Sequence, residues 1–583
     1  MMRFKGKVAH KFAESPLLQM RLPLWRSRLM ALLILGSFAV LIGRAFYLQT
    51  LNNDFLQEKG ESRYRRDIEI SASRGRIADR HGDVLAISTP MKSIWAIPPA
   101  TTMSPVQTRQ LAALLETDPK QLAQKLDTDK TFVFLRRQIP PPVAEQVAAL
   151  KLPGIGQDKE YRRFYPTGEM TAHMVGFTGV DDKGLEGVEL AFHGQLLGQP
   201  GSRSVIKDRR GQIVEDVGSI KPPQDGKEIR LALDSKIQYL AYSHLKQAIA
   251  ENNAKAGGVV VLDVRTGEIV ALANWPTYNP NNREGLSGGQ LRNRAVTDTF
   301  EPGSTLKPFT IGLALENGKV RSDTVINCAP GRLTIGSATI SDAHPHGALT
   351  VAEVIQKSSN VGAAKIAAML PAQKMWQMFD DVGFGQVPRL GFPGEVSGRV
   401  RPWKNWRPIE QATMSYGHGI SVSLIQLARA YSVFARDGDL MPLSLTRLDS
   451  STPTGAAVFS PKTAREVRSM LEMAVLPGGT APKAQIPGYR VAGKTGTAHK
   501  LEGGRYANKF VSSFVGFAPA SDPRLIVAVM IDEPSGGKHY GGDVAAPVFA
   551  AVMGNSLRTL GIAPDAPLVV AQSPKTPTPK ARL

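Results

Sequence analysis

An apolar segment near the start of the chain constrains the fold more than any other feature of the sequence. Residues 29–43, LMALLILGSFAVLIG, carry no charge, and the apolar character continues past Arg44 to Leu48. A helix over 29–48 is about 30 Å long at about 1.5 Å per residue, which matches the hydrocarbon core of a bilayer. Arg44 lies near the end of this span, where a long side chain reaches the headgroups. The sequence therefore predicts a transmembrane anchor at 29–48.

A cleaved signal peptide is the alternative for this segment. It is disfavoured because a long stretch precedes the apolar run and the bulky Phe46, Tyr47 and Leu48 follow it, whereas a cleavage site needs small residues. The preceding residues are rich in lysine and arginine and contain one acid, Glu14. The positive-inside rule then predicts a cytoplasmic tail at 1–28 and a single-pass anchor, with everything after the anchor exported.

The rest of the chain has the size and composition of several folded domains. Of its 583 residues 42% are hydrophobic, which is enough for real cores, and the length predicts about three to four units. The net charge of +20 favours anionic partners such as lipid headgroups. The charge is spread along the chain without a nucleic-acid-binding motif, so no nucleic acid is expected as a partner. The single cysteine, Cys328, excludes an intramolecular disulfide and a cysteine-based metal cage.

Proline- and glycine-rich polar stretches mark the expected domain boundaries. The segment KPPQDGKE at 221–228 predicts a boundary between a non-catalytic domain at 49–225 and a second domain at 226–562. Residues 563–583, rich in proline and lysine, predict a disordered tail. Within the first domain, residues 111–126 have helical spacing.

Residues 226–562 show the pattern of an α+β domain. Helical spacing over 234–252 precedes two strands within 257–274, which are joined by a turn at 265–267. A second strand pair is predicted within 512–534. Strand pairs at both ends, with helical patterns between them, predict helices packed on an antiparallel sheet.

The first chemical motif is EPGSTLKPF at 301–309. The pattern becomes helical after Gly303, so Ser304 and Lys307 lie on one helical face and can touch. A serine hydroxyl is a poor nucleophile until a base takes its proton, and a desolvated lysine can serve as that base. On its own, however, this spacing is more often a helix-capping serine followed by a surface lysine.

Two further motifs change that interpretation. KSSN at 357–360 offers the hydroxyl of Ser358 and the amide of Asn360 two positions apart. VAGKTGTA, whose apolar start predicts an edge strand, supplies Lys494, Thr495, Gly496 and Thr497. The ordered set S-x-x-K, S-x-N and K-T-G is the signature of penicillin-binding proteins and serine β-lactamases.

On these residues the chain resembles the class B penicillin-binding proteins, and among them most closely the division transpeptidases. The resemblance runs from the anchor to about residue 560. Besides the catalytic motifs it includes GRAFYLQ (43–49), RGRIADRHGDVLA (74–86), RRFYPTGEMTAHMVGFTG (162–179) and GLEGVE (184–189). One departure is YGHG at 416–419, where His418 stands at a position more often occupied by tyrosine in the family.

The resemblance implies a fold and a reaction. The fold is α+β, with a single N-terminal transmembrane helix, an elongated β-rich pedestal domain of the dimerisation type, and a penicillin-binding/β-lactamase-like transpeptidase domain. The reaction cross-links peptidoglycan stem pentapeptides that end in D-Ala-D-Ala, releases D-Ala during cell division, and is inhibited by β-lactams. The implied partners are an FtsW-like glycan polymerase and other divisome proteins at the septum. No cofactor and no metal is expected.

The resemblance also assigns catalytic roles as a hypothesis. Ser304 attacks the carbonyl of the penultimate D-Ala, and Lys307 accepts the serine proton. Ser358, placed between Lys307 and Lys494, relays a proton to the leaving amine. Lys494 keeps the site positive and is expected to lower the pKa of Lys307 through like charge and burial.

Substrate-binding roles follow from the same resemblance. Asn360 is expected to hold an amide of the donor peptide. The hydroxyls of Thr495 and Thr497, with Gly496 between them, are expected to bind the terminal carboxylate of the substrate. The backbone N–H groups of Ser304 and Thr497 are expected to form the oxyanion hole.

Other protein classes remain as alternatives. A bifunctional class A protein needs a glycosyltransferase domain within 49–225, which resembles the class B pedestal instead. A β-lactamase needs a deacylating glutamate between the second and third motifs, where Glu395 and Glu410 occur without a convincing context. An elongation-type class B transpeptidase is the close rival. A non-enzymatic β-lactam sensor is disfavoured because the tail at 1–28 is too short for a signalling region.

Two further patterns match other chemistries by letter. Residues 488–495 fit the P-loop pattern, but a P-loop needs a strand before it and a helix after it, and the flanking sequence predicts neither. His344 and His346 could suggest a metal pair, although a polar, proline-containing turn is the expected structure there.

Overall fold

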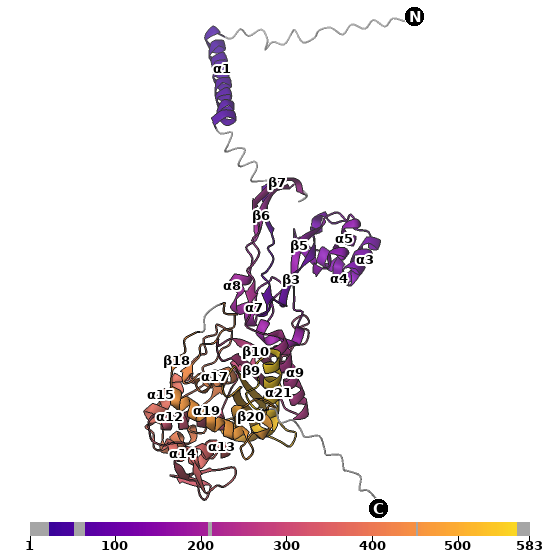
Figure 1. Ribbon diagram of the computed structural model, residues 1–583. Coiled ribbons are helices and arrows are strands. Elements are labelled where there is room, and N and C mark those ends of the chain that lie inside the picture. Colours follow the sequence, from indigo (N-terminus) through magenta and orange to yellow (C-terminus); the bar gives the residue numbers. More distant parts are fainter. Residues whose placement is uncertain (1–22, 52–64, 208–212, 450–452, 568–583) are drawn as a thin grey trace, which may run out of the picture. The chain divides into compact units, whose positions relative to one another are not determined.

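The computed structural model describes residues 23–51, 65–207, 213–449 and 453–567 (Figure 1). Most of the predicted cytoplasmic tail at 1–28 and most of the predicted disordered tail at 563–583 therefore lie outside the described residues.

Contacts within the chain define two compact units. One combines the chain up to Ile70 with Pro200–Pro223, and the other combines Ser71–Gln199 with the chain from Gln224 onward. The domain boundaries predicted from the sequence, including the division between 49–225 and 226–562, stay predictions.

The first unit contains the apolar helix. Helix α1, Leu24–Phe46, continues into a π-helical turn at Tyr47–Leu51. Within the span Leu24–Thr50, an 18-residue window has a mean hydropathy of 2.2 and none of it is buried. Within the described ranges this is the one helix long and apolar enough to cross a bilayer. The helix begins at Leu24 and not at residue 29, because residues 24–28, which precede the uncharged run, are also helical. Arg44 lies in its last turn.

The first unit also contains a three-stranded antiparallel sheet. Its strands are β1 (Arg65–Ile70), β6 (Gly201–Lys207) and β7 (Ile213–Lys221), in the order β1-β6-β7. The sheet thus joins segments that are far apart in the sequence.

The N-terminal part of the second unit is built around strand β3, Val84–Ala96. Strand β3 pairs with three others, namely β2 (Ile77–Ala78), β4 (Val133–Ile139) and β5 (Ile155–Phe164), and β2 pairs in turn with β8 (Ile229–Arg230). A small core forms where β3 and β4 pack against the helices α3 (Pro105–Leu114), α4 (Pro119–Leu126) and α5 (Pro141–Ala149).

The segment with helical spacing at 111–126 is two helices and not one. Helix α3 ends at Leu114, and α4 begins at Pro119. The Asp118 carboxylate caps α4 by accepting the N–H groups of Lys120 and Gln121. An Asp-Pro pair is a helix start signal, so it interrupts the periodic pattern.

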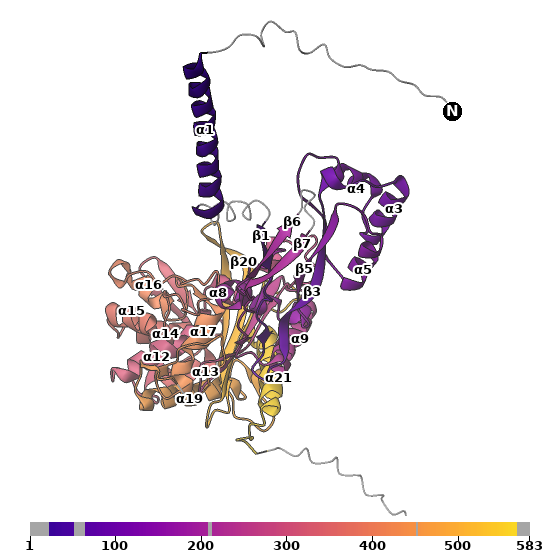
Figure 2. The ribbon, with the colours of Figure 1, turned by 90° about the horizontal axis from the view of Figure 1, so that it is seen from above.

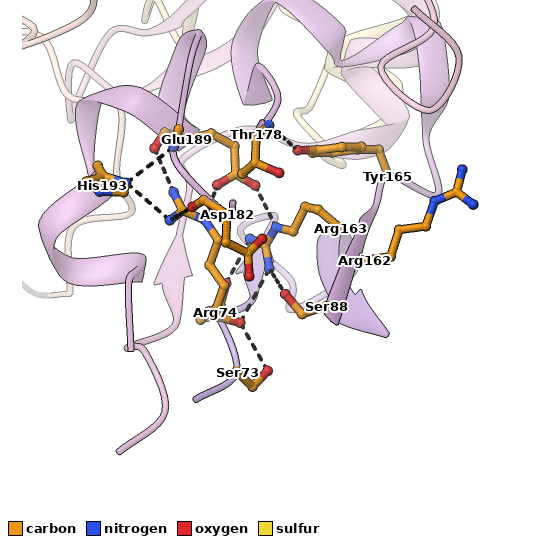
Figure 3. Close-up of polar contacts among 12 residues, drawn as sticks. Ser73, Arg74, Ser88, Arg162, Arg163, Tyr165, Thr178, Asp182, Glu189 and His193 are labelled. Carbon is orange, nitrogen blue, oxygen red and sulfur yellow. Dashed lines mark hydrogen bonds and ion pairs between the residues drawn. The ribbon is translucent and has the colours of Figure 1, made fainter. Parts of the chain in front are cut away.

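The family motifs of this part meet in a buried ion cluster (Figure 3). Glu189 accepts from Arg74 at 2.6 Å through one carboxylate oxygen and from Arg163 at 2.6 Å through the other, and all three side chains are almost completely buried. The guanidinium of Arg74 also donates to the carbonyl of Glu189, and that of Arg163 donates to the carbonyl of Gly75. The cluster therefore connects residues from the motifs at 74–86, 162–179 and 184–189.

The C-terminal part of the second unit contains a five-stranded antiparallel sheet. Its strands are β9 (Ala256–Asp263), β10 (Ile269–Trp275), β19 (Ala492–Glu502), β20 (Arg505–Ala518) and β21 (Leu525–Asp532). Their order is β10-β9-β21-β20-β19, which leaves β19 at one edge. Both predicted strand pairs and the predicted edge position of VAGKTGTA are confirmed.

Both faces of this sheet are buried, because alternate residues of its strands enter different cores. In β21, Val527 and Val529 join a core with helices α9 (Ser235–Glu251) and α21 (Ala546–Thr559). Ile526 and Ala528 join the larger core on the opposite face. Helix α9, capped by Asp234, confirms the helix predicted over 234–252.

The larger core contains the helices that carry the first two catalytic motifs. These helices are α12 (Lys307–Glu316), α13 (Val351–Lys357) and α14 (Asn360–Ala367). They share the core with α17 (Leu424–Ala430) and α19 (Pro461–Val475), and the whole group lies across the sheet from α9 and α21 (Figures 1 and 2). Two further helices, α15 (Ala372–Asp381) and α16 (Pro408–Met414), pack beside them. This α+β arrangement confirms the predicted fold class.

Candidate active site

Ser304 and Lys307 lie where a short turn enters a buried helix. The 3-10 turn Gly303–Leu306 leads into α12, Lys307–Glu316. Pro308 occupies the first turn of α12, where its missing N–H has no intrahelical partner to lose. The side-chain nitrogen of Lys307, Nζ, is 2.8 Å from Ser304 Oγ. The helix therefore places a base against the serine hydroxyl, as the i, i+3 spacing predicts.

Ser358 approaches Lys307 from another pair of helices. Helix α13, Val351–Lys357, is followed by Ser358, its C-cap residue, which has the left-handed backbone angles φ 63° and ψ 39°. Its carbonyl oxygen is 2.6 Å and its hydroxyl oxygen 3.0 Å from Lys307 Nζ. A non-glycine residue in this conformation is uncommon and costs free energy, so the surrounding structure must hold it there.

Strand β19 brings Lys494 to the same hydroxyl. Lys494 Nζ is 2.9 Å from Ser358 Oγ, and the side chains of Lys307 and Lys494 are both completely buried. The structure thus brings together Ser304, Lys307, Ser358 and Lys494, which come from three separate parts of the sequence.

The pKa values of both lysines in this cluster are lowered. Burial, together with the positive charge of Lys494, holds the pKa of Lys307 well below its usual range, while the nearby Asp342 opposes this shift. Burial lowers the pKa of Lys494 to about 7. An amine that is neutral near pH 7 can accept a proton, which a lysine with an ordinary pKa cannot do.

The lowered pKa of Lys494 makes a prediction about stability. Between about pH 7 and 10 the unfolded chain keeps a proton on Lys494 that the folded protein has released, so stability rises with pH in this window. We expect wild type to gain about 2 kcal/mol relative to Lys494→Met between pH 7 and pH 9. Urea unfolding of both proteins at the two pH values checks this, and equal pH dependence would contradict it.

The remaining residues of the third motif line the same edge strand. Thr495 is mostly buried, and its hydroxyl donates to Thr480 Oγ1 at 3.1 Å. The Thr497 hydroxyl oxygen accepts the N–H of Gly541 at 3.0 Å, so its own hydrogen is available to another acceptor. Gly303, beside Ser304, packs against the backbone of Thr497.

The serine turn approaches β19 so closely at Gly496 that only glycine fits at this position. A Cβ at this position would lie 2.4 Å from Ser513 Oγ and 2.7 Å from the Pro302 carbonyl oxygen, which belongs to the backbone just before Ser304. A side chain on Gly496 would therefore push the serine turn away from β19.

We expect Gly496→Ala to slow acylation by benzylpenicillin by about 100-fold, because a misplacement of about 1 Å at a reacting group has this effect. Gly347→Ala is the matched control, since no atom lies within 4 Å of its Cβ position. The measurement is the second-order rate of covalent labelling. A labelling rate within a factor of two of wild type would show that the position of Ser304 does not depend on the close approach of its turn to Gly496.

Asn360 stands apart from the four clustered residues. It is the first residue of α14, Asn360–Ala367, and its side-chain nitrogen donates to the Ser341 carbonyl at 2.9 Å. Its side chain makes no hydrogen bond to Ser304 or to either lysine of the cluster within the described ranges. Its role as a binder of the substrate amide stays a prediction.

Asp342 is a site residue that the sequence motifs did not reveal. One carboxylate oxygen accepts the N–H groups of Asn360 at 2.5 Å and Val361 at 2.9 Å, and the other accepts the Ser359 hydroxyl at 2.8 Å. These bonds hold the loop that carries Ser358. In the sequence, Asp342 is marked only by its place in the polar turn near His344. This turn has no fixed spacing from the catalytic motifs, so the motifs do not point to Asp342.

The YGHG segment packs directly on the serine turn. A Cβ on Gly417, where φ is +86°, would lie 2.2 Å from the Gly303 carbonyl oxygen, so only glycine fits. Burial and the charge of Lys307 lower the pKa of His418 to about 4, and the ring is therefore neutral at physiological pH. Its ring centre is 5.1 Å from that of Tyr416.

The segment that matches the P-loop pattern by letter does not have the structure of a P-loop. The P-loop-like residues 488–495 run into strand β19 and not into a helix. In the ranges that the structure describes, no group of three or more His, Cys, Asp or Glu residues could hold a metal ion.

Comparison with known proteins identifies the family. A model described as "Penicillin binding protein transpeptidase domain" matches residues 257–554, which contain all three catalytic motifs, and one described as "Penicillin-binding Protein dimerisation domain" matches residues 69–231. The chain is a class B penicillin-binding protein. The family predicted from the motifs is confirmed, and so is the prediction of a transpeptidase enzyme.

Relatives of this penicillin-binding protein match along almost their whole length. It is 46% identical over 556 residues to the "Probable peptidoglycan D,D-transpeptidase PenA" of Neisseria gonorrhoeae, covering 94% of this chain and 95% of the relative. It is 44% identical over 550 residues to the "Peptidoglycan D,D-transpeptidase FtsI" of Escherichia coli strain K12, covering 93% of each chain.

A solved structure matches the catalytic part of this penicillin-binding protein. It is the apo structure of the TP domain from Burkholderia pseudomallei penicillin-binding protein 3, with 51% sequence identity and a TM-score of 0.54. The match covers 58% of this chain and 98% of that domain.

Proposed function

We propose that this protein is the septal peptidoglycan D,D-transpeptidase of its cell, that it works through an acyl-enzyme on Ser304, and that β-lactams inhibit it. The observation that carries the proposal is the contact chain Ser304–Lys307–Ser358–Lys494, in which both lysines are completely buried. The 44% identity to a protein named FtsI favours division over the elongation-type alternative.

The first step is acylation of Ser304, for which Lys307 is the proton acceptor. A neutral Lys307 amine has two hydrogens, which suit the carbonyl and hydroxyl oxygens of Ser358, and one lone pair, which suits the hydroxyl hydrogen of Ser304. Ser304 Oγ attacks the carbonyl of the penultimate D-Ala while its proton passes to Lys307. The peptide C–N bond then breaks, and the leaving D-Ala amine takes a proton relayed through Ser358.

The edge strand orients the substrate during this step. The Thr497 hydroxyl donates its available hydrogen to the terminal carboxylate, near the charge of Lys494. The Thr495 hydroxyl binds the same carboxylate once its hydrogen turns to it from Thr480. The backbone N–H groups of Ser304 and Thr497 stabilise the oxyanion, a contribution of about 3 kcal/mol per donor in other acyl-transfer enzymes. Asn360 binds an amide of the donor peptide.

Cross-linking completes the reaction. The amine of a second stem peptide attacks the Ser304 ester, an amide bond forms, and the serine recovers its proton. A β-lactam mimics D-Ala-D-Ala and acylates the same oxygen, but its leaving group stays attached, so the ester persists.

The anchor places this reaction at the membrane. Helix α1 holds the chain in the inner membrane with the N-terminus in the cytoplasm and the catalytic part in the periplasm, as the basic residues before it indicate. An FtsW-like glycan polymerase and other divisome proteins are the proposed partners there.

A depletion strain tests the proposal. We expect depletion to give filamentous cells, a fluorescent fusion to collect at the septum, and wild type but not Ser304→Ala to restore division. Rounded cells with sidewall fluorescence would instead support the elongation-type enzyme. Restoration of division by Ser304→Ala would overturn the catalytic proposal.

A further inference from the structure

Asp342 is a half-buried carboxylate beside the catalytic cluster that belongs to none of the three motifs. One of its oxygens accepts the N–H groups of Asn360 and Val361, and the other accepts the hydroxyl of Ser359. The two N–H groups are the first of helix α14, where the helix itself leaves them without a carbonyl partner. N–H groups at the start of a helix favour an ionised carboxylate, so Asp342 carries a negative charge here.

The negative charge of Asp342 is not balanced by an ion pair. In the part of the chain that the structure describes, no lysine, arginine or histidine forms an ion pair with its carboxylate. Lys365, on the same helix α14, donates instead to the carbonyl of Asn327 at 2.6 Å. The charge of Asp342 therefore remains to act on other groups near it.

The buried amine of Lys307 lies near charges of both signs. Burial lowers the pKa of Lys307 most, the charge of Lys494 lowers it further, and the charge of Asp342 raises it. His418 is the other titratable group that faces Lys307, and its ring is neutral at physiological pH because its pKa is about 4. Asp342 is thus the one anion among the groups that act on the charge of Lys307 in the described residues.

The charge of Lys307 changes twice during the proposed acylation. The amine becomes an ammonium when it takes the proton of Ser304, and it becomes neutral again when that proton passes through Ser358 to the leaving nitrogen. The C–O bond that forms and the C–N bond that breaks do not involve Asp342. A fixed anion near the buried amine stabilises the ammonium, which exists only between the two proton transfers.

We propose that Asp342 is the counter-charge of Lys307, and that its carboxylate stabilises the ammonium that forms during acylation of Ser304. Asp342 touches neither the substrate nor the reacting atoms, so it is a positioning residue that acts through Lys307. This role deepens the proposed function, on which it rests, because it names the group that offsets the repulsion between the two buried lysines.

The pH dependence of penicillin labelling tests this role. The second-order rate of labelling by benzylpenicillin is measured on the full-length protein in detergent, for wild type and Asp342→Asn, across the pH range in which the rate falls on the acid side. Asparagine keeps an oxygen for the N–H groups of Asn360 and Val361 but has no charge. Without the anion Lys307 holds its proton less tightly, so we expect the fall that reports Lys307 to move about 1 pH unit to lower pH. Above this fall we expect labelling to be about 3-fold slower, because a weaker base takes the serine proton.

The same profile contains an internal reference. Burial lowers the pKa of Lys494 to about 7, without a contribution from Asp342, so any change of rate near pH 7 is expected to stay in place in Asp342→Asn. Asp323→Asn is the matched control, since Asp323 is an exposed carboxylate that pairs with Arg321. We expect this control to leave the whole profile unchanged.

Two further variants separate the charge from the hydrogen bonds. Ser359→Ala removes one hydrogen bond to Asp342 and keeps the charge, so we expect it to slow labelling by the same factor at every pH. Asp342→Glu keeps the charge and changes the geometry, so we expect the fall that reports Lys307 to stay close to its wild-type position. The thermal midpoint of each variant shows whether it is folded.

A profile of Asp342→Asn that is lowered by the same factor at every pH, or a fall that moves to higher pH, would overturn the inference. Asp342 would then act only through its hydrogen bonds, while the proposed function would stand because Ser304 is still labelled. If Asp342→Asn does not fold, a fall that moves in Asp342→Glu although the charge is kept would overturn the inference equally. Absence of a penicillin adduct on Ser304 of wild type would overturn the proposed function and the inference with it.

Discussion

Replacement of Lys307 by methionine is expected to slow acylation of Ser304 by benzylpenicillin about 1,000-fold or more, because the serine loses the only base within reach of its proton among the described residues. The fold is expected to tolerate the change. Methionine has a similar length, and the variant no longer buries an amine whose charged form is disfavoured by desolvation. The labelling rate and the thermal midpoint, measured on the same preparation, check both parts.

Lys307→Arg is the informative companion to this variant. Arginine keeps a cation at the position but does not give up its proton in proteins, so it cannot act as the base. We therefore expect it to be as slow as the methionine variant. If either variant were labelled at close to the wild-type rate, another group would have to take the serine proton, and the assigned role of Lys307 would be wrong.

Removal of the Glu189 carboxylate is expected to cause the largest loss of stability. Glu189→Ala leaves Arg74 and Arg163 buried side by side without the carboxylate that forms an ion pair with both. Removing one partner of a buried ion pair costs about 3–5 kcal/mol. Urea unfolding measures this loss.

Glu228→Ala is the control for that measurement. Glu228 pairs with Arg76 in the same part of the chain, but both side chains are well exposed. Exposed pairs contribute about 0–1 kcal/mol. Similar losses for the two variants would mean that the buried cluster has no special role in holding the three family motifs together.

The sequence predicts a strand or a catalytic contact well where it depends on residues that are close together in the chain. Spacing of three residues on a helix puts Lys307 against Ser304, and an alternating or continuous apolar run predicts β9, β10, β20 and β21. The family signature adds that Ser358 and Lys494 meet, although they are 136 residues apart.

Other features depend on contacts for which the chain carries no periodic signal. The left-handed backbone of Ser358 is held by tertiary packing, and Asp342 caps its loop from a turn with no fixed spacing. The motif GLEGVE does not reveal that Glu189 is buried, because burial of its charge depends on two arginines that lie far away in the sequence.

The most direct test of the account is the intact mass of the full-length protein with and without benzylpenicillin, alongside Ser304→Ala. The account predicts a gain of one drug molecule per chain that persists for minutes in wild type and is absent from the variant. An adduct that persists in Ser304→Ala, or no adduct in wild type, would contradict the assignment of Ser304 as the nucleophile.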